Sequence, residues 1–435
     1  MSQKVTDIYN ELQWRQLVYQ STSDRMGSWL LERPRTVYAG FDPTSDSLHV
    51  GHLLPLLMLR RFQKAGHRPI ALVGGATGSI GDPSGKSQER NLQSLDQIEA
   101  NVVAIRRQMS ELLDFTSSDH SALGPALLVN NYDWISQFSY LDFLRDVGKN
   151  VPVNVMISKD SVKNRLENPD VGISYTEFSY MLLQAYDFVH LNRTYGCELQ
   201  LGGSDQWGNV TAGIDLARRM AGAEVFGMTC PLLTKSDGTK MGKTEGGALW
   251  LDGKKTSPYH FYQYWRNVAD EDASKCLRFL TELSQEEVEH LDRCRQTEPE
   301  RAASQIRLAE WLTELIHGAA ALNLVRQATE IFFGGEIGKF ESDDDLNQIF
   351  AEVPSSRLAA SRLAEGLAIA DALVEAKLTK SKGEARRVVV EGGAYVNNRR
   401  IESETHQITT ADLSSPTMIV LRRGKKNYAL LRVVE

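Results

Sequence analysis

Residues 38–52 read YAGFDPTSDSLHVGH and join an apolar run to a helical pattern through a tight turn. Residues 37–41 have the pattern of a buried strand, residues 42–47 are turn formers, and a helix is expected from about His49. A strand that turns into a helix N-terminus is where open α/β sheets bind phosphate, because unpaired N–H groups point outward there. The stretch matches neither GxxxxGK[ST] nor GxGxxG, so two imidazoles and a threonine would meet the phosphates.

Short apolar runs and helical patterns alternate over about residues 35–235. Strands are expected at 37–41, 69–75, 126–130, 198–203 and 231–233, and helices at 49–64, 95–114, 175–190 and 210–220. The alternation predicts an α/β fold with a doubly wound, mostly parallel, Rossmann-like sheet. Pro55 lies inside the first of these helices and predicts a local kink. Residues 78–86 are expected to form a loop at the ligand side of the sheet.

The length of 435 residues suggests two or three domains. We expect a sheet domain at 1–240 with a helical insertion at about 131–175, a loop and helical domain at 241–340, a linker at 341–370, and a small α+β domain at 371–435. Aromatic residues in the insertion fit a dimer surface and ordinary core packing about equally well. The sequence shows no internal repeat.

The composition, with 42% hydrophobic and 24% charged residues, is that of a soluble globular protein. No apolar run approaches the ~18 residues of a membrane helix, and the polar N-terminus lacks the pattern of a secretory signal. The cysteines at 197, 230, 276 and 294 show neither paired spacing nor CxxC. This usage favours reduced thiols in a cytoplasmic setting and argues against structural zinc.

Charge is distributed unevenly along the chain. The net charge is −7, yet residues 371–435 contain 12 Lys and Arg against 8 Asp and Glu. A basic tail on an acidic body suggests an appended module for an anionic partner.

Two short motifs carry the chemistry. His49 and His52 are three residues apart and are expected on one helix face, where both can donate to a phosphate. Alternatively, they form a structural pair or bind a metal ion. The sequence shows no further ligand at the spacing that a metal site needs. KMGKT at 240–244 lies in a glycine- and charge-rich segment that, alone, would indicate a solvated loop. Mobile lysines can also close over a polyphosphate and neutralise its leaving group. The two motifs in this order are more specific than either alone.

The motifs resemble those of class I aminoacyl-tRNA synthetases. HVGH at 49–52 resembles their HIGH motif, and KMGKT at 240–244 resembles their KMSKS loop. YAGFDPT at 38–44, GDPS at 81–84, YMLLQAYDF at 180–188 and GGSDQWGN at 202–209 are similar to bacterial-type tyrosyl-tRNA synthetases, and the resemblance extends over essentially the whole chain. Val50, Gly242 and Thr244 depart from the motifs, which bears on the fine tuning of loop closure.

The resemblance implies the partners L-tyrosine, ATP and tRNA(Tyr), with Mg²⁺ accompanying ATP and no dedicated protein metal site. The tyrosine-binding residues would be Tyr38, Asp82, Tyr180, Gln184, Asp187 and Gln206. ATP would be bound by Gly40, Asp42, Gly51, Gly203, Asp205 and Lys243. The catalytic residues would be Thr44, His49, His52, Lys240, Lys243 and Thr244. Contacts to tRNA would come from Lys86, Arg90, Lys380, Lys382, Arg386 and Arg387.

The side chains agree with these roles. Tyr38 and Asp187 could bind a phenol hydroxyl, and the spacing of Tyr180, Gln184 and Asp187 puts all three on one helix face. Residues 378–397 resemble a small RNA-binding domain first known from a ribosomal protein, with a basic helix suited to RNA phosphates. By the same resemblance, the helical domain would meet the anticodon arm.

We therefore expect a cytoplasmic tyrosine–tRNA ligase, with a homodimer as the expected assembly and neither DNA nor membrane as a partner. One alternative is a tryptophanyl-type ligase on the same fold, against which Tyr38 and Asp187 argue. The other alternative is an RNA-binding protein derived from a synthetase, which has either lost the catalytic activity or gained an RNA-binding role beside it. The intact histidines and lysines of both motifs argue against a loss of catalytic activity.

Overall fold

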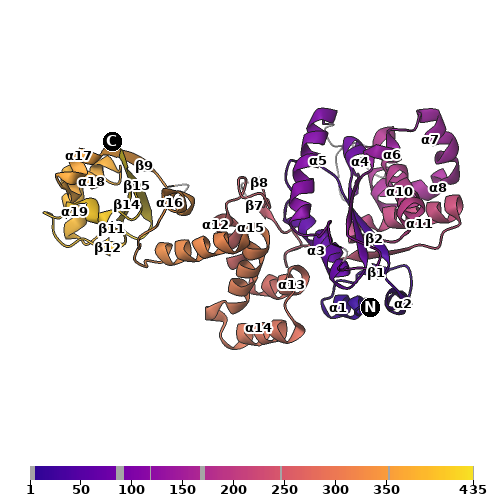
Figure 1. The fold of residues 1–435 in the computed structure, drawn as a ribbon, viewed down its shortest axis with the longest axis horizontal. Coiled ribbons are helices and arrows are strands. Elements are labelled where there is room, and N and C mark those ends of the chain that lie inside the picture. The colour runs from indigo at the N-terminus through magenta and orange to yellow at the C-terminus, as the bar shows by residue number, and fades with distance from the viewer. Residues whose placement is uncertain are drawn as a thin grey trace. The chain divides into compact units, whose positions relative to one another are not determined.

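The computed structural model describes residues 5–84, 93–117, 119–166, 172–244, 247–350 and 353–434. The chain divides into two compact units, residues 1–256 with 265–312 and residues 257–264 with 313–435. Each is described by itself (Figure 1). No helix in the described ranges is long and apolar enough to cross a membrane.

The first unit is built on a six-stranded sheet with the order β1-β6-β5-β2-β3-β4. Its strands are β1 (Gln20–Ser21), β2 (Thr36–Phe41), β3 (Arg68–Val73), β4 (Leu127–Asn130), β5 (Cys197–Gly203) and β6 (Phe226–Cys230). All neighbours pair in parallel except β1, which is antiparallel to β6. The predicted doubly wound, mostly parallel sheet is confirmed.

Helices cover both faces of this sheet (Figure 1). They are α1 (Ile8–Trp14), α2 (Met26–Glu32), α3 (Val50–Lys64), α4 (Gly75–Ile80), α5 (Leu95–Ser110), α10 (Tyr175–Tyr195) and α11 (Trp207–Ala221). α3 and α5 lie on one face, and α10 and α11 on the other. α3 continues through Pro55, and its apolar residues are buried nearly all round. Side chains of α10 and α11 form a core with residues of β2 and β3, among them Tyr38, Ile70 and Phe188.

Two expectations about this unit were wrong. The last strand is β6 at Phe226–Cys230, not residues 231–233, because Pro231 has no N–H group with which to extend the ladder. Gly78 lies in a helix, α4, instead of a loop. The Asn130 and Asn131 side-chain oxygens accept from the N–H groups of Gly75 and Ala76, at 3.1 and 2.8 Å, and so stabilise the start of α4. These partners are 55 residues away in the sequence, out of reach of a local pattern.

Between β4 and α10 the described residues form short helices without a strand. They are α6 (Tyr132–Ile135), α7 (Tyr140–Asp146), the 3₁₀ turn Gly148–Asn150, α8 (Val153–Ile157) and α9 (Asp160–Leu166). The remainder of the first unit contains the short strands β7 (Lys243–Thr244) and β8 (Gly247–Ala248), α13 (Asp270–Leu280), α14 (Gln285–Thr297) and the first part of α15 (Ala303–Phe332). α15 consists of two helices that meet at Gly318, whose φ of 85° breaks the helical geometry.

The second unit contains most of α12 (Pro258–Arg266), the end of α15 and the C-terminal residues. Its five-stranded sheet has the order β12-β11-β14-β15-β9. The strands are β9 (Ser355–Ala359), β11 (Ala394–Val396), β12 (Arg399–Arg400), β14 (Met418–Arg423) and β15 (Asn427–Val434), and a separate ladder joins β10 (Leu367–Ala368) to β13 (Gln407–Ile408). The helices are α16 (Asp343–Ile349), α17 (Ala360–Ala364), α18 (Ile369–Glu375) and α19 (Lys382–Val390).

Residues 341–370, expected as a linker, are largely folded. The acidic run at 343–345 forms the first turn of α16, where carboxylates are favoured by the helix dipole, and Ser342 caps that turn. Asp343 also accepts hydrogen bonds from Ser415 and Thr417. β9 pairs in parallel with β15, so this segment belongs to the C-terminal sheet. Its acidic and Pro-Ser-Ser composition concealed these long-range partners.

Candidate active site

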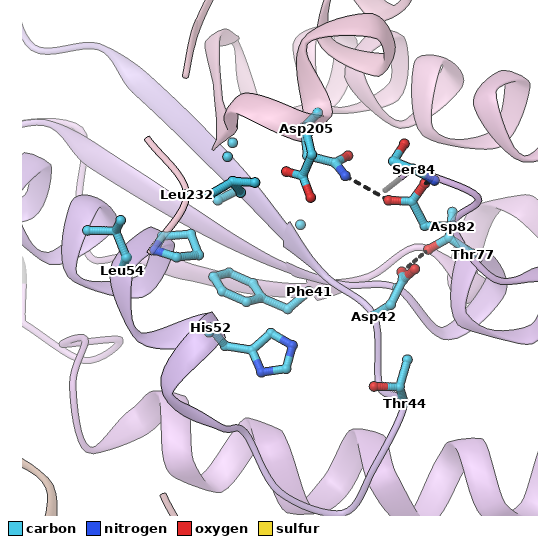
Figure 2. A pocket seen from close by; sticks show the side chains of 18 of the residues that line it. Phe41, Asp42, Thr44, His52, Leu54, Thr77, Asp82, Ser84, Asp205 and Leu232 are labelled. Carbon is cyan, nitrogen blue, oxygen red and sulfur yellow. Dashed lines mark hydrogen bonds between the residues drawn. The ribbon is translucent and has the colours of Figure 1, made fainter. Parts of the chain in front are cut away.

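A cavity of about 710 Å³ opens at the carboxyl ends of β2, β3, β5 and β6. This is the edge at which open α/β sheets bind ligands. Figure 2 shows Asp42, Thr77 and Asp82 gathered on one side of it, with His52 and Leu54 elsewhere on the wall. Its lining includes every residue expected for tyrosine and for ATP, together with Thr44, His49, His52, Lys240 and Lys243.

The remaining expected site residues fall into two groups. Lys86 and Arg90 lie outside the described residues, as does the side chain of Thr244, whose backbone is in β7. Lys380, Lys382, Arg386 and Arg387 belong to the second unit, on α19 or the turn before it.

Tyr38 is the buried phenol in the cavity wall. It lies on β2, is 1% exposed, and packs edge-on against Phe188 with 5.2 Å between ring centroids. Its hydroxyl has no hydrogen-bond partner among the described residues. Burial and the nearby Asp187 carboxylate raise the pKa of this phenol well above its ordinary value, so it is a neutral donor and acceptor. A buried hydroxyl without a partner costs about 1–3 kcal/mol and indicates a ligand group at this point.

Asp187 is held beside Tyr38 by two donors from outside α10. Its Oδ1 accepts from Trp134 Nε1 at 2.9 Å, and its Oδ2 accepts from Asn131 Nδ2 at 3.0 Å. Trp134 in turn stacks on His190 with 4.2 Å between ring centroids. Burial raises the pKa of Asp187 to about 7, against the lowering effect of the two hydrogen bonds. The carboxylate is thus fixed in orientation while its charge is poorly solvated.

A second polar group surrounds Asp42 and Tyr180. Asp42 Oδ2 accepts from the Tyr180 hydroxyl at 2.9 Å, and its Oδ1 accepts from Thr77 Oγ1 at 2.7 Å. Asn131 Nδ2 also donates to Thr77 Oγ1, at 3.0 Å, which links this group to Asp187. Asp42, which was expected to bind ATP, is therefore hydrogen-bonded to Tyr180, which was expected to bind tyrosine.

Gln184, Gln206 and Asp82 form a chain across the cavity. Gln184 Nε2 donates to Gln206 Oε1 at 3.2 Å, and Gln206 Nε2 donates to Asp82 Oδ2 at 2.7 Å. Asp82 is fixed further by the N–H group of Ser84. Gln184 Oε1 is buried without a partner among the described residues. This chain presents carboxylate and amide oxygens suited to an ammonium group.

His49 and His52 are arranged by the start of α3. His49 is the N-cap: its Nδ1 accepts from the Gly51 N–H at 3.0 Å, and His52 Nδ1 accepts from the His49 N–H at 3.2 Å. Their ring centroids are 4.0 Å apart. Since each Nδ1 accepts, each neutral ring carries its proton on Nε2 and can donate from there.

The first three main-chain N–H groups of α3 have partners within the protein. The Val50 N–H donates to Leu249 O, the Gly51 N–H to His49 and the His52 N–H to His49 O. The amides are therefore already bonded within the protein. The imidazoles, rather than the helix backbone, are the donors that this segment offers to a ligand.

Comparison with known proteins identifies the family. Residues 31–334 match the family model of class I tRNA synthetases (W and Y), and residues 345–431 match a tyrosine–tRNA ligase SYY-like C-terminal domain. A tyrosine–tRNA ligase of Rhodopirellula baltica is 55% identical over 434 residues, covering 99% of this chain and 98% of the relative. One from Roseiflexus castenholzii is 52% identical over 432 residues, covering 99% and 100%. The chain belongs to the tyrosine–tRNA ligase family.

The known structures agree with the assignment to the tyrosine–tRNA ligases. A C-terminally truncated mitochondrial tyrosyl-tRNA synthetase of Aspergillus nidulans superposes with a TM-score of 0.67 at 29% identity, covering 75% of this chain and 94% of that one. The expected fold class is thereby confirmed.

The KMGKT segment of this tyrosine–tRNA ligase family member forms two small hairpins. Thr234 pairs with Lys240 across the first, and β7 pairs with β8 in the second. Between them, Gly242 has a φ of +82°, and a Cβ on it would lie 3.0 Å from Val50 Cβ. Two departures from the family motifs, Val50 and Gly242, therefore contact each other. Lys240 and Lys243 are exposed at the cavity rim.

Gly203, the last residue of β5, and Asp205, in the turn that follows, line the cavity. Burial, and then the Asp82 carboxylate, raise the pKa of Asp205. A Cβ on Gly203 would lie 2.8 Å from Asp205 Oδ1 and 3.1 Å from Leu232, so a larger residue would crowd these two side chains at the cavity wall. Gly40 is less restricted, because an added Cβ would meet only Leu72, at 3.9 Å.

Four residues that shape the site were missed in the sequence. They are Thr77, Asn131, Trp134 and Asn209, whose Nδ2 donates to Gln206 Oε1. Trp134 looked like core or dimer surface, and Asn131 was assigned no role. The one available signal was the Asn130-Asn131 pair directly after an apolar run, since polar residues at the carboxyl end of a parallel strand reach the ligand edge.

Proposed function

We propose that this protein activates L-tyrosine with ATP to form tyrosyl-adenylate and pyrophosphate, and then transfers tyrosine to the 3′ end of tRNA(Tyr). The observation that carries the proposal is the buried Tyr38 hydroxyl, which has no partner among the described residues and lies beside the oriented Asp187 carboxylate. Together they offer one donor and one acceptor to a phenol. The tyrosine–tRNA ligase names of relatives that span the whole chain support the same substrate.

The amino acid would enter with its phenol toward Tyr38 and Asp187. Its ammonium would meet Tyr180, Gln184 and Asp82, and Gln206 would lie near the carboxylate. In this position the tyrosine carboxylate attacks the ATP α-phosphate, forming a new P–O bond as the bond to pyrophosphate breaks. No protein nucleophile is required, so catalysis comes from positioning and charge stabilisation.

The ATP side of the site would hold and neutralise the phosphates. Gly40, Gly51, Gly203 and Asp205 would border the nucleotide, and Asp42 would lie between it and the amino acid. Thr44, His49 and His52 would donate to the phosphates, with Lys240 and Lys243 closing over pyrophosphate and Thr244 beside them. In the second step the tRNA 3′-hydroxyl attacks the carbonyl carbon of the adenylate, and AMP leaves.

Mg²⁺ would arrive with ATP. Among the described residues no group of three or more His, Cys, Asp or Glu side chains could hold a metal ion. The ATP phosphates would coordinate the ion, with its remaining ligands from water.

Binding of tRNA would use both units. Lys86 and Arg90 would meet the acceptor end, while Lys380, Lys382, Arg386 and Arg387 would contact the phosphate backbone. Arg386 and Arg387 are exposed on α19, which supports this role. The four cysteines are free, which agrees with a cytoplasmic location.

We infer a homodimer from the apolar surface of the insertion. Leu141 is 74% exposed and Tyr140 63%, and α7 buries none of its residues. Val153 and Ile157 on α8 are exposed as well. Such side chains are buried when a second copy covers them. Sedimentation of the protein should give the dimer mass, and Leu141→Arg should give the monomer; a wild-type monomer would refute the assembly.

The function is tested by ATP–pyrophosphate exchange with each of the twenty amino acids in the absence of tRNA. We expect exchange with tyrosine alone. Exchange with tryptophan would indicate the sister ligase. No exchange with any amino acid would favour the RNA-binding alternative, against which the intact His49, His52, Lys240 and Lys243 argue.

A further inference from the structure

One face of α13 holds the start of the first of the two hairpins, in which Thr234 pairs with Lys240 and which we call the KMGKT hairpin. Asp272 Oδ1 accepts from the Ser236 N–H at 2.8 Å. Lys275 Nζ donates to Thr234 O at 2.9 Å and to Thr234 Oγ1 at 3.2 Å. One residue further, Cys276 Sγ lies 3.3 Å from Met241 Sδ, and both side chains are buried. The spacing i, i+3, i+4 puts these three anchors on a single helix face.

The hairpin that they hold is braced by its own hydrogen bonds. The Met241 N–H donates to Leu233 O at 2.9 Å, and the Lys235 N–H donates to Thr239 O at 2.8 Å. Since the segment is cross-linked internally, displacing the anchored base also displaces Lys240. The α13 contacts therefore set the position of this lysine.

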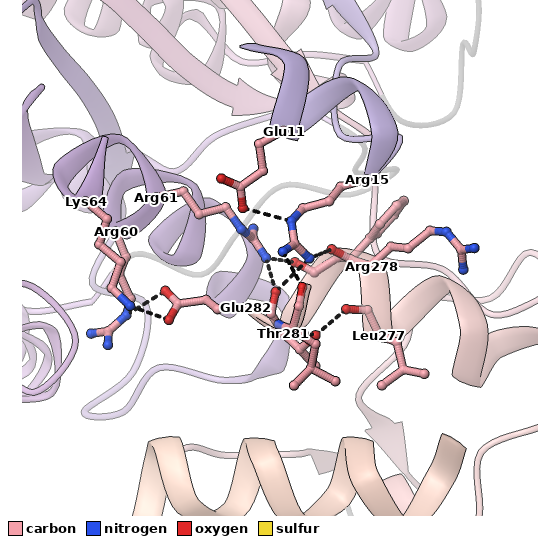
Figure 3. A network of polar contacts seen from close by, with 11 residues as sticks. Glu11, Arg15, Arg60, Arg61, Lys64, Leu277, Arg278, Thr281 and Glu282 are labelled. Carbon is pink, nitrogen blue, oxygen red and sulfur yellow. Dashed lines mark hydrogen bonds and ion pairs between the residues drawn. The ribbon is translucent and has the colours of Figure 1, made fainter. Parts of the chain in front are cut away.

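The other end of α13 is fixed to α1 and α3 (Figure 3). Arg61 Nη2 donates to Phe279 O and Thr281 O, both at 2.8 Å, and Arg15 donates to the carbonyls of Arg278, Thr281 and Leu283. The last carbonyls of a helix have no partner within it, and cations stabilise this negative end of the dipole. Burial lowers the pKa of Arg61 to about 10, which still leaves it charged at neutral pH.

α3 connects this clamp to the catalytic histidines. Arg61 lies in its last turn, and His49 is its N-cap. The side chains of α3 are buried along most of its length, so it is held as a rigid element. His49 and His52 at one end of α3 are thus tied through Arg61 to α13, and α13 is tied to the hairpin.

We propose that α13 is the anchor that places the KMGKT hairpin relative to the HVGH helix, with Asp272 and Lys275 as positioning residues for Lys240 and Lys243. The inference rests on the proposed ATP-dependent activation. Loss of either anchor leaves the tyrosine subsite intact, because no hydrogen bond among the described residues joins Tyr38, Tyr180 or Asp187 to α13. It displaces only the lysines that meet the polyphosphate.

The test compares Lys275→Met and Asp272→Asn with Glu271→Gln, an exposed carboxylate next to Asp272 on the same helix. In ATP–pyrophosphate exchange with tyrosine, we expect Lys275→Met to lower kcat/KM for ATP about 10-fold and to leave KM for tyrosine within about 2-fold. Lys275→Arg, which keeps the donor, should recover most of the loss. Glu271→Gln should match the wild type.

Limited trypsin digestion reports on the hairpin directly, since Lys235 and Lys240 are cleavage sites within it and Lys243 follows three residues after Lys240. Cleavage there should be faster in Lys275→Met and Asp272→Asn than in Glu271→Gln, with no change in Tm. Unchanged cleavage, or equal losses in kcat/KM for both substrates, would overturn the inference. If the wild type shows no exchange with tyrosine, the proposed function fails instead.

Discussion

At the scale of single residues, the site contains buried polar atoms that have no partner among the described residues. The Tyr38 hydroxyl and Gln184 Oε1 are buried without partners among the described residues, and the buried Asp187 carboxylate accepts only side-chain donors. Each such group costs about 1–3 kcal/mol in the free protein. A ligand that pairs with them recovers that free energy, and a ligand that lacks the matching polar atom does not.

The pKa of Asp187 gives a pH-dependent prediction. Because burial raises this pKa to about 7, the carboxyl is protonated in the free protein at lower pH and loses its charge-assisted bond to a phenol. We expect kcat/KM for tyrosine in ATP–pyrophosphate exchange to fall as the pH drops through about 7. Asp187→Asn should lower kcat/KM for tyrosine at high pH, and its kcat/KM should no longer fall as the pH drops through about 7. If kcat/KM of the variant still falls in this range, another group is responsible for the pH dependence.

Gly242 gives a second residue-scale prediction. A side chain there is strained at φ +82° and would press on Val50, at a cost of about 1–2 kcal/mol. Gly242→Ala should lower kcat for adenylate formation roughly 10-fold, because Lys243 follows directly, while KM for tyrosine stays unchanged. Val50→Ala in the same chain should restore part of the rate. Wild-type kinetics for Gly242→Ala would show that this contact has no role in catalysis.

At the scale of elements, sequence patterns predicted the strands and helices whose signals are local. The apolar runs before Asp42 and Gly74 became β2 and β3, and the helix after His49 became α3. The failures share one cause. α4 depends on Asn130 and Asn131, and β9 depends on β15, so both need partners far away in the sequence. The same cause explains why the donors that orient Asp187 were missed: Asn131 and Trp134 are more than 50 residues from it.

Trp134 permits a prediction at this scale, because it ties α6 to α10 through Asp187. Trp134→Phe keeps an aromatic ring on His190 but removes the Nε1 donor. We expect kcat/KM for tyrosine to fall about 10-fold through misorientation of the carboxylate, with KM for ATP unchanged. Trp29→Phe, at a partly exposed tryptophan of α2 that packs on Phe226, serves as the comparison for the loss of an indole elsewhere in the first unit. Equal effects on KM for tyrosine in both variants would contradict the role of Trp134.

At the scale of the whole molecule, amino-acid activation and RNA binding are assigned to different parts of the chain. Every described residue that lines the cavity belongs to the first unit, while Arg386 and Arg387 belong to the second. The double variant Arg386→Ala/Arg387→Ala should lower kcat/KM for tRNA charging about 10-fold and reduce its salt dependence. Exchange without tRNA should be unaffected.

The matched control for that variant is Arg218→Ala/Arg219→Ala, an adjacent exposed pair on α11 in the first unit. Both arginines are paired with Asp215. Charging by the control should keep the wild-type salt dependence. The assignment of RNA binding to α19 fails if both double variants lose charging to the same extent.

The central claim is that Tyr38 and Asp187 select a phenol hydroxyl, and it is tested by kcat/KM for tyrosine against phenylalanine in ATP–pyrophosphate exchange, for the wild type and Tyr38→Phe. We predict a wild-type preference for tyrosine on the order of 100-fold or more, because phenylalanine leaves the Tyr38 hydroxyl without a partner and makes no hydrogen bond to Asp187. Tyr38→Phe should lower the ratio of kcat/KM for tyrosine to kcat/KM for phenylalanine about 10-fold, chiefly by lowering kcat/KM for tyrosine. Equal use of both amino acids by the wild type, or an unchanged ratio in Tyr38→Phe, would contradict the account.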